Sequence, residues 1–442
     1  MNREDDAVRP SGLRRWQQLL RGLQVDVTPW RTSRDFRLLM SAGTVFYFGH
    51  MLTYVAIPYQ VYRLTGSNLA VGAIGAVELV PLVVFGLYGG ALADHVDRRR
   101  LLVVTGLAQA VLTALLAANA FAPRPQVWVV FVLAALLVSA GALQRPSREA
   151  LLPRTVNHAE IPAANALTGL GMQAGLLAGP ALGGLLIAFV GLGWCFAIDV
   201  VGLLIATALF AMLRSYPHQS ETTAPSLRSI AAGLSYAVSR RDLLGTYLVD
   251  LAAMFLAFPV VLFPALAQDV FARPELLGLL YSAQTLGALV ATALSGWTGR
   301  VRRHGRAIVV AAAVYGAFIA AAGLAPSMEL VVLCLMGAGA ADMISAIFRG
   351  TIWNQTIPEA MRGRLAGIEM LSYSVGPLGG QVRAGLVADA WSVRGSIASG
   401  GALCVIGVLL TAAAIGDFWG YDALTDEHAA AERAARAAAG EA

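Results

Sequence analysis

Twelve long apolar runs dominate the 442-residue sequence and restrict it to a helical membrane fold. Hydrophobic residues make up 57% of the chain and charged residues 13%, whereas soluble domains carry about 25% charged residues. A membrane-spanning helix needs about 20 mostly apolar residues, because lipid cannot pair exposed backbone groups. The expected spans are 38–62, 69–92, 101–122, 127–146, 163–189, 194–213, 243–267, 276–298, 307–325, 328–350, 365–388 and 396–416. We therefore expect an all-α polytopic membrane protein with twelve transmembrane helices.

The twelve runs divide into two matching halves around one long polar linker. Gly179-Pro180 lies in the fifth span of the first half, and Gly376-Pro377 lies in the fifth span of the second half. Such repetition suits an alternating-access transporter whose site lies at the midplane between two pseudo-symmetric six-helix bundles. The expected parts are an N-terminal segment 1–37, a bundle 38–213, a linker 214–242, a bundle 243–416 and a tail 417–442.

Arginine placement predicts the orientation of the chain in the membrane. The sequence has no Lys, so all 32 basic residues are Arg, and they concentrate in alternate loops such as 98–100 and 300–306. Because cytoplasmic loops collect positive charge, we expect a multi-pass protein of the cell membrane with both termini in the cytoplasm. The net charge of +5 sits in short clusters between apolar runs. It therefore predicts contact with the lipid bilayer and no binding of nucleic acid.

The loop after the second span carries a short motif, Gly90-Ala-Leu-Ala-Asp94-His-Val-Asp-Arg98-Arg99-Arg100. Gly90 would allow close approach of a neighbouring helix. Asp94 can face the N-terminus of another helix or an Arg. The motif predicts a gating loop, and the alternative is that Arg98 and Arg99 only anchor the topology.

This loop resembles the Gly-x-Leu-Ala-Asp-Arg-x-Gly-Arg-Arg pattern of the major facilitator superfamily, from which His95 and Asp97 depart. Within that superfamily the chain is similar to the enterobactin exporter group of siderophore and drug exporters. The similarity rests also on the runs 26–58, 263–267 and 356–364. The resemblance covers roughly residues 25–416 and implies the major facilitator fold with secondary active transport.

Span five contains a glycine series ending in Gly-Pro-x-x-Gly-Gly. Glycines four residues apart form a smooth face for tight helix packing, and a proline within a helix removes a backbone donor and can bend it. The spacing also resembles the antiporter motif of superfamily exporters, which implies export and a role in sealing or bending the interface between the halves. Ordinary small-residue packing is the alternative. The residues are Gly171, Gly175, Gly179, Pro180, Gly183 and Gly184.

Ionisable residues at membrane depth are the candidate coupling sites, because each is costly there. Glu78 and His50 lie near the middle of spans two and one. A carboxyl group away from water holds its proton more readily, so Glu78 could exchange a proton in each cycle and His50 could share it. The alternative is a structural hydrogen bond to a neighbouring helix.

The second half has its own group, Asp250, Asp342, Arg349 and Glu369. Asp342 and Arg349 are seven residues apart and share one helix face. The resemblance places spans seven and ten along the central cavity, where this group would carry protons or bind a polar substrate. A static salt-bridge network at the inner gate is an equal alternative.

Further charged residues lie inside the first half. Arg145 and Arg148, at the inner end of span four, are candidates for substrate binding or the inner gate, with an intrahelical network including Glu149 as the alternative. We expect a structural role for Asp199, because the resemblance places span six at the periphery.

The sequence thus favours a secondary active exporter driven by proton influx, acting on a siderophore or an amphipathic drug-like molecule. An ATP-binding loop needs a Lys, which the chain lacks, and no catalytic constellation or metal-ligand spacing is present. We expect a monomer that is not an enzyme and uses the proton gradient in place of a cofactor. The alternatives are a proton-coupled importer or facilitator of a small metabolite, and a non-transporting membrane scaffold or sensor.

Overall fold

The computed structural model describes residues 26–216 and 235–438, with the side chains of 87–95, 359–360, 362–364, 366–373, 435–436 and 438 left out. Within these residues the chain is helical and has no strand. The first half contains α2 (Thr28–Thr32), α3 (Arg34–Thr65), α4 (Asn68–His95), α5 (Arg98–Phe121), α6 (Val127–Leu151), α7 (Ile161–Phe189) and α8 (Leu192–Ala211). The second half contains α10 (Arg241–Ala257), α11 (Phe263–Ala265), α12 (Leu277–Ala293), α13 (His304–Leu324), α14 (Met328–Thr356), α15 (Glu359–Ala390), α16 (Val393–Ala414), α17 (Gly416–Gly420) and α18 (Glu427–Ala438).

A helix covers all or most of each expected span. In the described part of the chain, eleven helices are long and apolar enough to cross a membrane. Helix α15, with 32 residues, covers the remaining expected span 365–388. The prediction of twelve spanning helices is confirmed.

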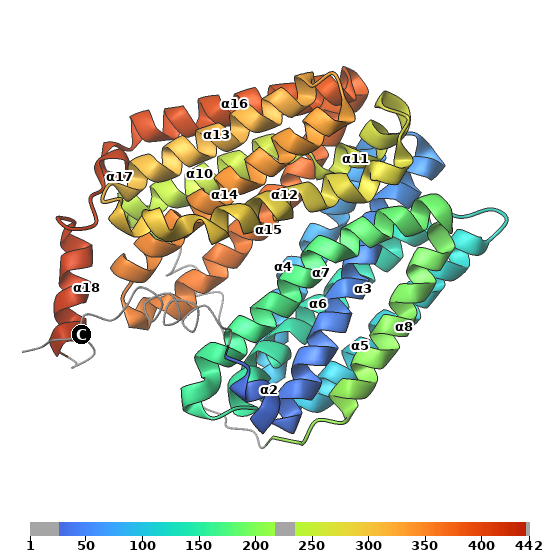
Figure 1. Cartoon of the computed structure of the whole chain (residues 1–442), viewed down its shortest axis with the longest axis horizontal. Helices are drawn as coiled ribbons and strands as arrows, with labels where there is room; N and C mark the ends of the chain where they lie inside the picture. Colours follow the sequence, from blue (N-terminus) through green and yellow to red (C-terminus); the bar gives the residue numbers. More distant parts are fainter. Residues whose placement is uncertain (1–25, 217–234, 439–442) are drawn as a thin grey trace, which may run out of the picture.

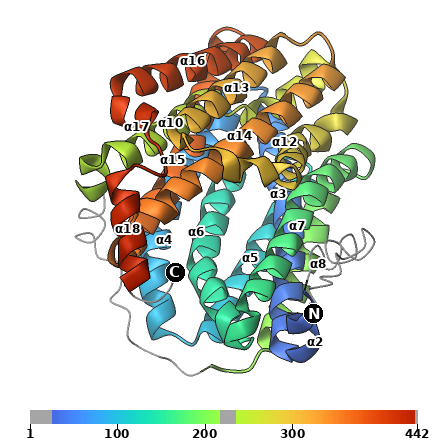
Figure 2. The same ribbon diagram turned by 60° about the vertical axis from the view of Figure 1, so that its left-hand side comes forward.

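The two halves pack their helices in the same pattern, as Figures 1 and 2 show. In the first bundle α3 packs against α7 and α8, while α5 packs against α6 and α8. In the second bundle α10 packs against α15 and α16, while α13 packs against α14 and α16. The bundles meet along two helix pairs, α4 with α15 and α7 with α12, which are equivalent under the exchange of halves.

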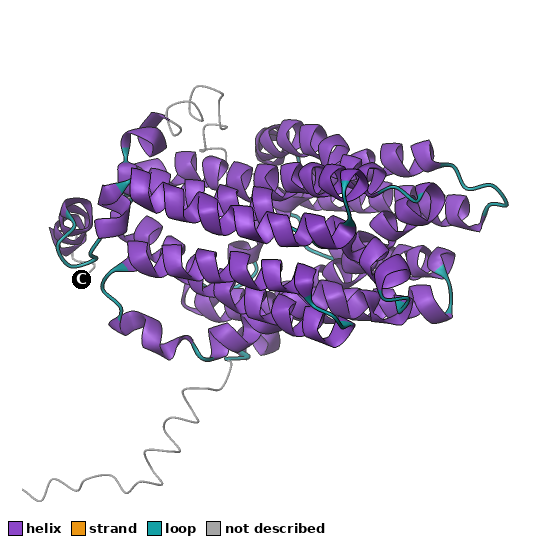
Figure 3. Cartoon of the chain, turned by 90° about the horizontal axis from the view of Figure 1, so that it is seen from above, coloured by secondary structure: helices purple, strands orange, loops and turns teal. Residues whose placement is uncertain are grey.

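The bundles lie close together at one end of the molecule and apart at the other (Figure 1). The end that carries α2, α17 and α18, together with the connection between the halves, is called the linker end. The opposite end, which carries α11 and the connection from α7 to α8, is called the far end. Viewed from above, the helices run roughly side by side between the two ends (Figure 3).

The expected seventh span, 243–267, is not one continuous helix. Helix α10 ends at Ala257, and Phe258 adopts an extended conformation with φ −90° and ψ 101°. Pro259 follows, and a proline disfavours the helical conformation of the residue before it. A 3-10 turn, the short α11 and a π-helix over Leu266–Val270 complete the path to the far end.

The boundaries of the first and last parts also differ from the expectation. Helix α3 begins at Arg34, inside the expected N-terminal segment 1–37, because Ser33 caps it by accepting from the Phe36 N–H. Residues past 416, expected as a tail, contain the helices α17 and α18.

Close packing of α7 against α3 yields a matched pair of variants. A Cβ on Gly179 would overlap the Cβ of Met51, whereas a Cβ on Gly169 in the same helix would meet nothing within 4 Å. We expect Gly179→Ala to lower stability by about 1–3 kcal/mol, since overpacking displaces α3, and Gly169→Ala to leave it unchanged or slightly raised. Thermal unfolding of both purified variants checks this, and equal midpoints would contradict it.

Candidate functional site

A cavity of about 340 Å³ lies along the inner face of the first bundle. Helices α3, α4, α5, α6 and α8 supply most of its wall, and the second half contributes only Val260, Val261 and Gln381. The wall is mainly apolar and aromatic, with a few polar groups, as is usual for small-molecule sites. The polar and ionisable members are His50, Thr53, Tyr54, Glu78, Gln109, Thr113, Gln144, Arg145, Arg148, Asp199 and Gln381, with Tyr47 beside them.

The predicted pair Glu78 and His50 lies in this cavity. The imidazole of His50 stacks on the ring of Phe46, with centroids 5.9 Å apart and planes at 5°, and His50 is exposed to the cavity. Glu78 is half-buried, and it makes no hydrogen bond or ion pair with any residue that the structure describes. Both side chains are therefore accessible to a molecule in the cavity.

Arg145 and Arg148 lie where α6 approaches the linker end, and they differ in their contacts. Arg148 donates to the Tyr47 hydroxyl at 2.8 Å, and its guanidinium lies 4.6 Å from the centroid of the Tyr47 ring. Arg145 pairs with Glu149 at 2.8 Å on an exposed face. The expected intrahelical network therefore includes Arg145 but not Arg148, which is fixed on aromatic rings of α3.

Asp199 also lies in the cavity wall, although the family resemblance, which places span six at the periphery, had suggested a structural role. Asp199 is 2% exposed, and the Thr53 hydroxyl of α3 donates a hydrogen bond to its Oδ2. The sequence signal was present, since a lone acid within the apolar helix α8 is costly. What the sequence could not indicate is that α8 places this acid beside α3 at the cavity.

Asp250, Asp342 and Arg349 form the expected cluster, but it is separate from the cavity. Arg349 contacts Asp250 at 2.6 Å and Asp342 at 3.7 Å. The side chains of Arg349 and Asp250 are 3% and 2% exposed, whereas that of Asp342 is 38% exposed. None of the three lines the cavity that holds Glu78 and His50. The side chain of Glu369 lies outside the described part, as do those of Gly90 and Asp94.

The rest of the loop motif joins α5 to the end of α8. Arg99 donates to the Ala211 carbonyl at the C-terminus of α8. Asp97 caps α5 by accepting from the backbone of Arg99 and Arg100, and its other oxygen accepts from Ser215 at 2.8 Å. Asp97, a departure from the superfamily pattern, thus has a clear local role as an N-cap. Arg98 also has an interaction partner.

The glycine series of α7 lies mainly within the first bundle. Gly175 and Gly179 face α3, where a Cβ would crowd Tyr47 and Met51, and Gly183 faces Leu52. Gly184 alone among the four reaches the other bundle, where a Cβ would overlap the backbone of Gly278 in α12. The Pro180 carbonyl lies against Gly278 as well. The expectation that this series seals the interface therefore applies to Pro180 and Gly184.

The far end is closed by hydrogen bonds between the bundles, here called the far-end gate. Asp389 at the end of α15 accepts from the Ser67 hydroxyl at 2.6 Å, from the N–H and side-chain amide of Asn68 at 2.9 and 3.0 Å, and from the Leu69 N–H at 3.0 Å. It thereby caps the N-terminus of α4 in the opposite bundle. The Tyr62 hydroxyl of α3 donates to Asp269. The gate consists of these residues and the Gly184–Gly278 contact.

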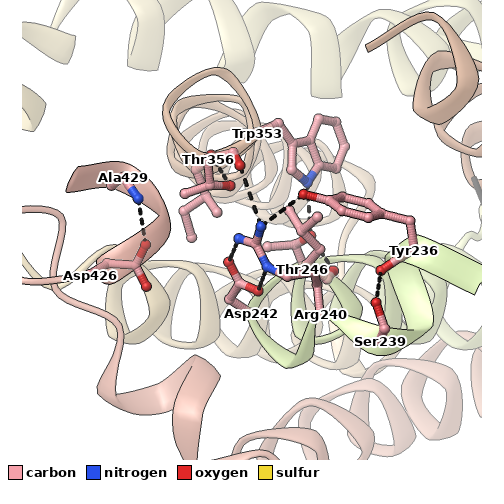
Figure 4. Close-up of polar contacts among 11 residues, drawn as sticks. Tyr236, Ser239, Arg240, Asp242, Thr246, Trp353, Thr356, Asp426 and Ala429 are labelled. Atoms are coloured by element: carbon pink, nitrogen blue, oxygen red, sulfur yellow. Dashed lines mark hydrogen bonds and ion pairs between the residues drawn. The ribbon is translucent and has the colours of Figure 1, made fainter. Parts of the chain in front are cut away.

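At the linker end the polar contacts of Arg240 lie within the second bundle and do not join the two bundles. Arg240 forms a bidentate pair with Asp242 at 2.9 and 2.5 Å, donates to the Tyr236 hydroxyl at 3.0 Å, and reaches the Thr356 carbonyl (Figure 4). This cluster fixes the start of α10 to the end of α14 within the second bundle. Between residues that the structure describes, no hydrogen bond or ion pair joins the two bundles at this end.

Partial burial raises the pKa of the Asp389 carboxyl, but the hydrogen bonds from Ser67, Leu69 and Asn68 outweigh it, so its pKa lies below the ordinary 3.8. The ionised form therefore stabilises the closed gate. That contribution is complete above pH 3.8 and is lost as the pH falls through the lowered value. Near neutral pH Asp389 therefore stays ionised and holds the gate closed.

The far-end gate can be tested by distances between the bundles. We expect Asp389→Ala to weaken closure by about 1 kcal/mol or more, because it removes a charged acceptor from several donors. Spin labels on Cys residues at the exposed loop positions Arg124 and Pro326 should then show longer distances. Asp417→Ala at the linker end is the control, and unchanged distances in Asp389→Ala would contradict the gate.

The buried charge cluster can be tested by a double variant. We expect Arg349→Met to destabilise the protein by about 3–5 kcal/mol, because it takes the cation away from the buried Asp250. Asp250→Asn combined with Arg349→Met should recover most of this loss. Thermal unfolding in detergent measures both, and a single variant as stable as the unchanged protein would disprove the charge pairing.

No group of three or more His, Cys, Asp or Glu in the described residues could hold a metal ion. Cys195, Cys334 and Cys404 are free thiols in buried positions. The site is therefore described by its cavity, its separate charge cluster and its closed far end.

Comparisons with known proteins agree with this architecture. The enterobactin exporter EntS of Escherichia coli O1:K1 is 28% identical over 383 residues, which cover 86% of this chain and 92% of that protein. A bacterial homolog of the human lysosomal transporter Spinster, inward-facing and unoccupied, matches with a TM-score of 0.65 and 14% identity over 87% of this chain and 95% of that one. The nucleoside transporter NupG matches with a TM-score of 0.66 and 14% identity over 88% of this chain and all of that one.

The sequence also matches the family described as transmembrane secretion effector over residues 26–430. This range includes both bundles, the cavity and the far-end gate. The relatives are membrane transporters and not enzymes. The chain is a multi-pass membrane transporter and belongs to the transmembrane secretion effector family of the major facilitator superfamily.

Proposed function

We propose that this transporter is a proton-coupled exporter that moves a siderophore or another amphipathic small molecule out of the cell by alternating access. The observation that carries the proposal is the cavity, which holds Glu78 and His50 beside a bundle interface closed at one end only. Such an arrangement can admit cargo from one side and, after the bundles rock, release it on the other.

The orientation of the protein in the membrane follows from the charge pattern. The Arg-rich segments, including 98–100 and 300–306, lie at the linker end, and positive charge favours the cytoplasmic side. The linker end then faces the cytoplasm of the cell membrane, with both termini inside. The conformation is accordingly inward-facing, with Asp389 and Tyr62 holding the outer side closed.

The composition of the cavity supports an amphipathic cargo. Phe46, Tyr47 and Tyr54 offer aromatic surface, while Arg148 and Glu78 offer charge of either sign. Aromatic rings with a few polar groups bind molecules that combine ring systems with polar substituents. The similarity to the enterobactin exporter supports a siderophore as the first cargo to test.

The coupling residue in this proposal is Glu78, with His50 as its partner in proton exchange. Glu78 faces the cavity without a cation among the described residues, so cargo and proton can compete for it. Asp250 is held by Arg349 at 2.6 Å, and this pair, with Asp342, serves as a static support of the second bundle. The protein works as a monomer, with the proton gradient as its energy source and without a cofactor.

Transport by reconstituted protein tests the proposal. Inside-out proteoliposomes with an acidic lumen should accumulate labelled enterobactin or an amphipathic dye. We expect Glu78→Gln to abolish the part driven by the pH gradient, since the amide cannot release a proton. Glu329→Gln, which alters an exposed pair with Arg273, should retain it as the control.

The same vesicles distinguish the opposite direction. An importer would accumulate cargo in right-side-out vesicles with an acidic exterior. Accumulation only in that geometry, or no dependence on the pH gradient in either geometry, would overturn the proposal.

A further inference from the structure

The cavity wall contains a second carboxyl group, Asp199, to which the proposed export mechanism has given no role. Asp199 lies on α8 and is 2% exposed, yet it borders the same cavity as Glu78 and His50. Its carboxyl fits against the backbone of α3, where a Cβ on Gly49 would overlap Oδ1. Glycine at position 49 thus provides the space that the carboxyl occupies.

One oxygen of Asp199 is satisfied and the other is not. Oδ2 is bonded to the Thr53 hydroxyl. Oδ1 is buried and has no hydrogen-bond partner in the described part of the chain. The Cys195 thiol, one turn earlier on α8, is directed to the Leu52 carbonyl at 3.7 Å and not to Asp199.

No cation faces Asp199 from the helices that pack around it. Helix α3 contributes the uncharged Thr53, which is hydrogen-bonded to Asp199. His50 of the same helix forms no ion pair with Asp199 in the described residues. Helix α5 presents the neutral Gln109 and Thr113 to the cavity, and its ionisable residues, Arg98–Arg100, lie at the linker end. The segment α7 has no ionisable residue, and α8 itself adds only Cys195.

This environment decides the protonation state. A carboxylate that is buried with one free oxygen and no counter-ion is strongly disfavoured, whereas a neutral acid is tolerated. The neutral acid can share a hydrogen bond with Thr53 in either direction. Asp199 is therefore protonated in this conformation, in which the far-end gate is closed.

We propose that Asp199 is a second proton-carrying residue of the transport cycle, an inference that rests on the proposed proton-coupled export. When cargo and water enter the cavity, the O–H bond of Asp199 breaks and the proton passes to a cavity water, which leaves a carboxylate. Rebinding of a proton from the opposite side restores the neutral acid. Helix α3 contacts Asp199 through Thr53 and also carries Tyr62 of the far-end gate. A change in the charge of Asp199 therefore acts on the same helix that holds the gate closed.

The experiment compares Asp199→Asn with Asp35→Asn in the reconstituted protein. Asparagine has the shape of the neutral acid and keeps an acceptor for Thr53, but it cannot release a proton. Asp35 is also a buried acid bonded to a hydroxyl, that of Tyr216 at 2.6 Å, but it does not line the cavity. It therefore controls for the loss of a buried carboxyl as such.

Two transport modes separate a proton carrier from a structural residue. Counterflow of labelled against unlabelled cargo needs no net proton movement, whereas accumulation driven by the pH gradient does. We expect Asp199→Asn to keep counterflow, to lose most gradient-driven accumulation and to release fewer protons when cargo is added to purified protein. Asp35→Asn should behave as the unchanged protein in all three measurements.

A second readout does not depend on the asparagine variant folding. Infrared difference spectra recorded on adding cargo should contain a protonated-carboxyl band that shifts in Thr53→Val, since that variant removes the hydroxyl bonded to Oδ2. An unshifted band would overturn the inference even if Asp199→Asn cannot be purified.

The outcomes distinguish this inference from the proposed function. If the unchanged protein shows gradient-driven export and Asp199→Asn shows it equally, Asp199 is structural and only the inference fails. If the unchanged protein shows no dependence on the gradient, both the export mechanism and the role of Asp199 fail.

Discussion

An acid within a helical bundle needs a cation, a set of hydrogen-bond donors or a proton, and this requirement organises the polar chemistry of the transporter. Each of these three ways of stabilising an acid occurs at a different place. Asp250 forms a salt bridge with Arg349 at 2.6 Å. Asp389 accepts hydrogen bonds from several donors, since it caps the N-terminus of α4. Among the described residues Glu78 has neither, Asp199 has only the Thr53 hydroxyl, and both acids border the cavity. Of the four, the acids that lack a cation and a set of donors are therefore the two that border the cavity.

The need to stabilise buried acids also distinguishes contacts that hold each bundle together from contacts that join the two bundles. The paired acids fix helices to each other, as Arg240 and Asp242 do at the linker end of the second bundle. The far-end gate is built from hydrogen bonds between bundles and from backbone approaches such as Gly184 to Gly278. Such contacts join one bundle to the other and lie within neither of them. A bundle pair can then rock while each bundle stays intact.

The two bundles contribute unequally to the described part of the cavity wall, although they are matched in helix packing. Among the residues whose side chains the structure describes, the ionisable members of the wall come from the first bundle, and the second bundle supplies Val260, Val261 and Gln381. The break after Ala257 places Val260 and Val261 there, because Pro259 stops the helix before the far end. In this conformation cargo would meet the ionisable groups of the first bundle, while Arg349 of the second bundle is paired with Asp250 and Asp342.

The amino-acid sequence by itself determined the class of fold, because apolar runs of sufficient length leave the chain no other way to satisfy its backbone in lipid. It also indicated the two halves, the placing of Glu78 and His50 in adjacent spans, and the joining of Asp342 to Arg349 on one helix face. These features are local or periodic along the chain. The break in span seven was missed, although Pro259 was a visible signal for it.

Only the tertiary structure decided which polar residues share a site. Asp199 meets Thr53 across 146 residues of sequence, and Asp389 meets Asn68 across 321. It also separated the cluster around Arg349 from the cavity that holds Glu78 and His50, whereas the family resemblance had placed spans seven and ten along the central cavity. The physical reason is that helix neighbours in a bundle are chosen by the fit of small residues and backbones, such as Gly49 beside Asp199, and this fit has no period in the sequence.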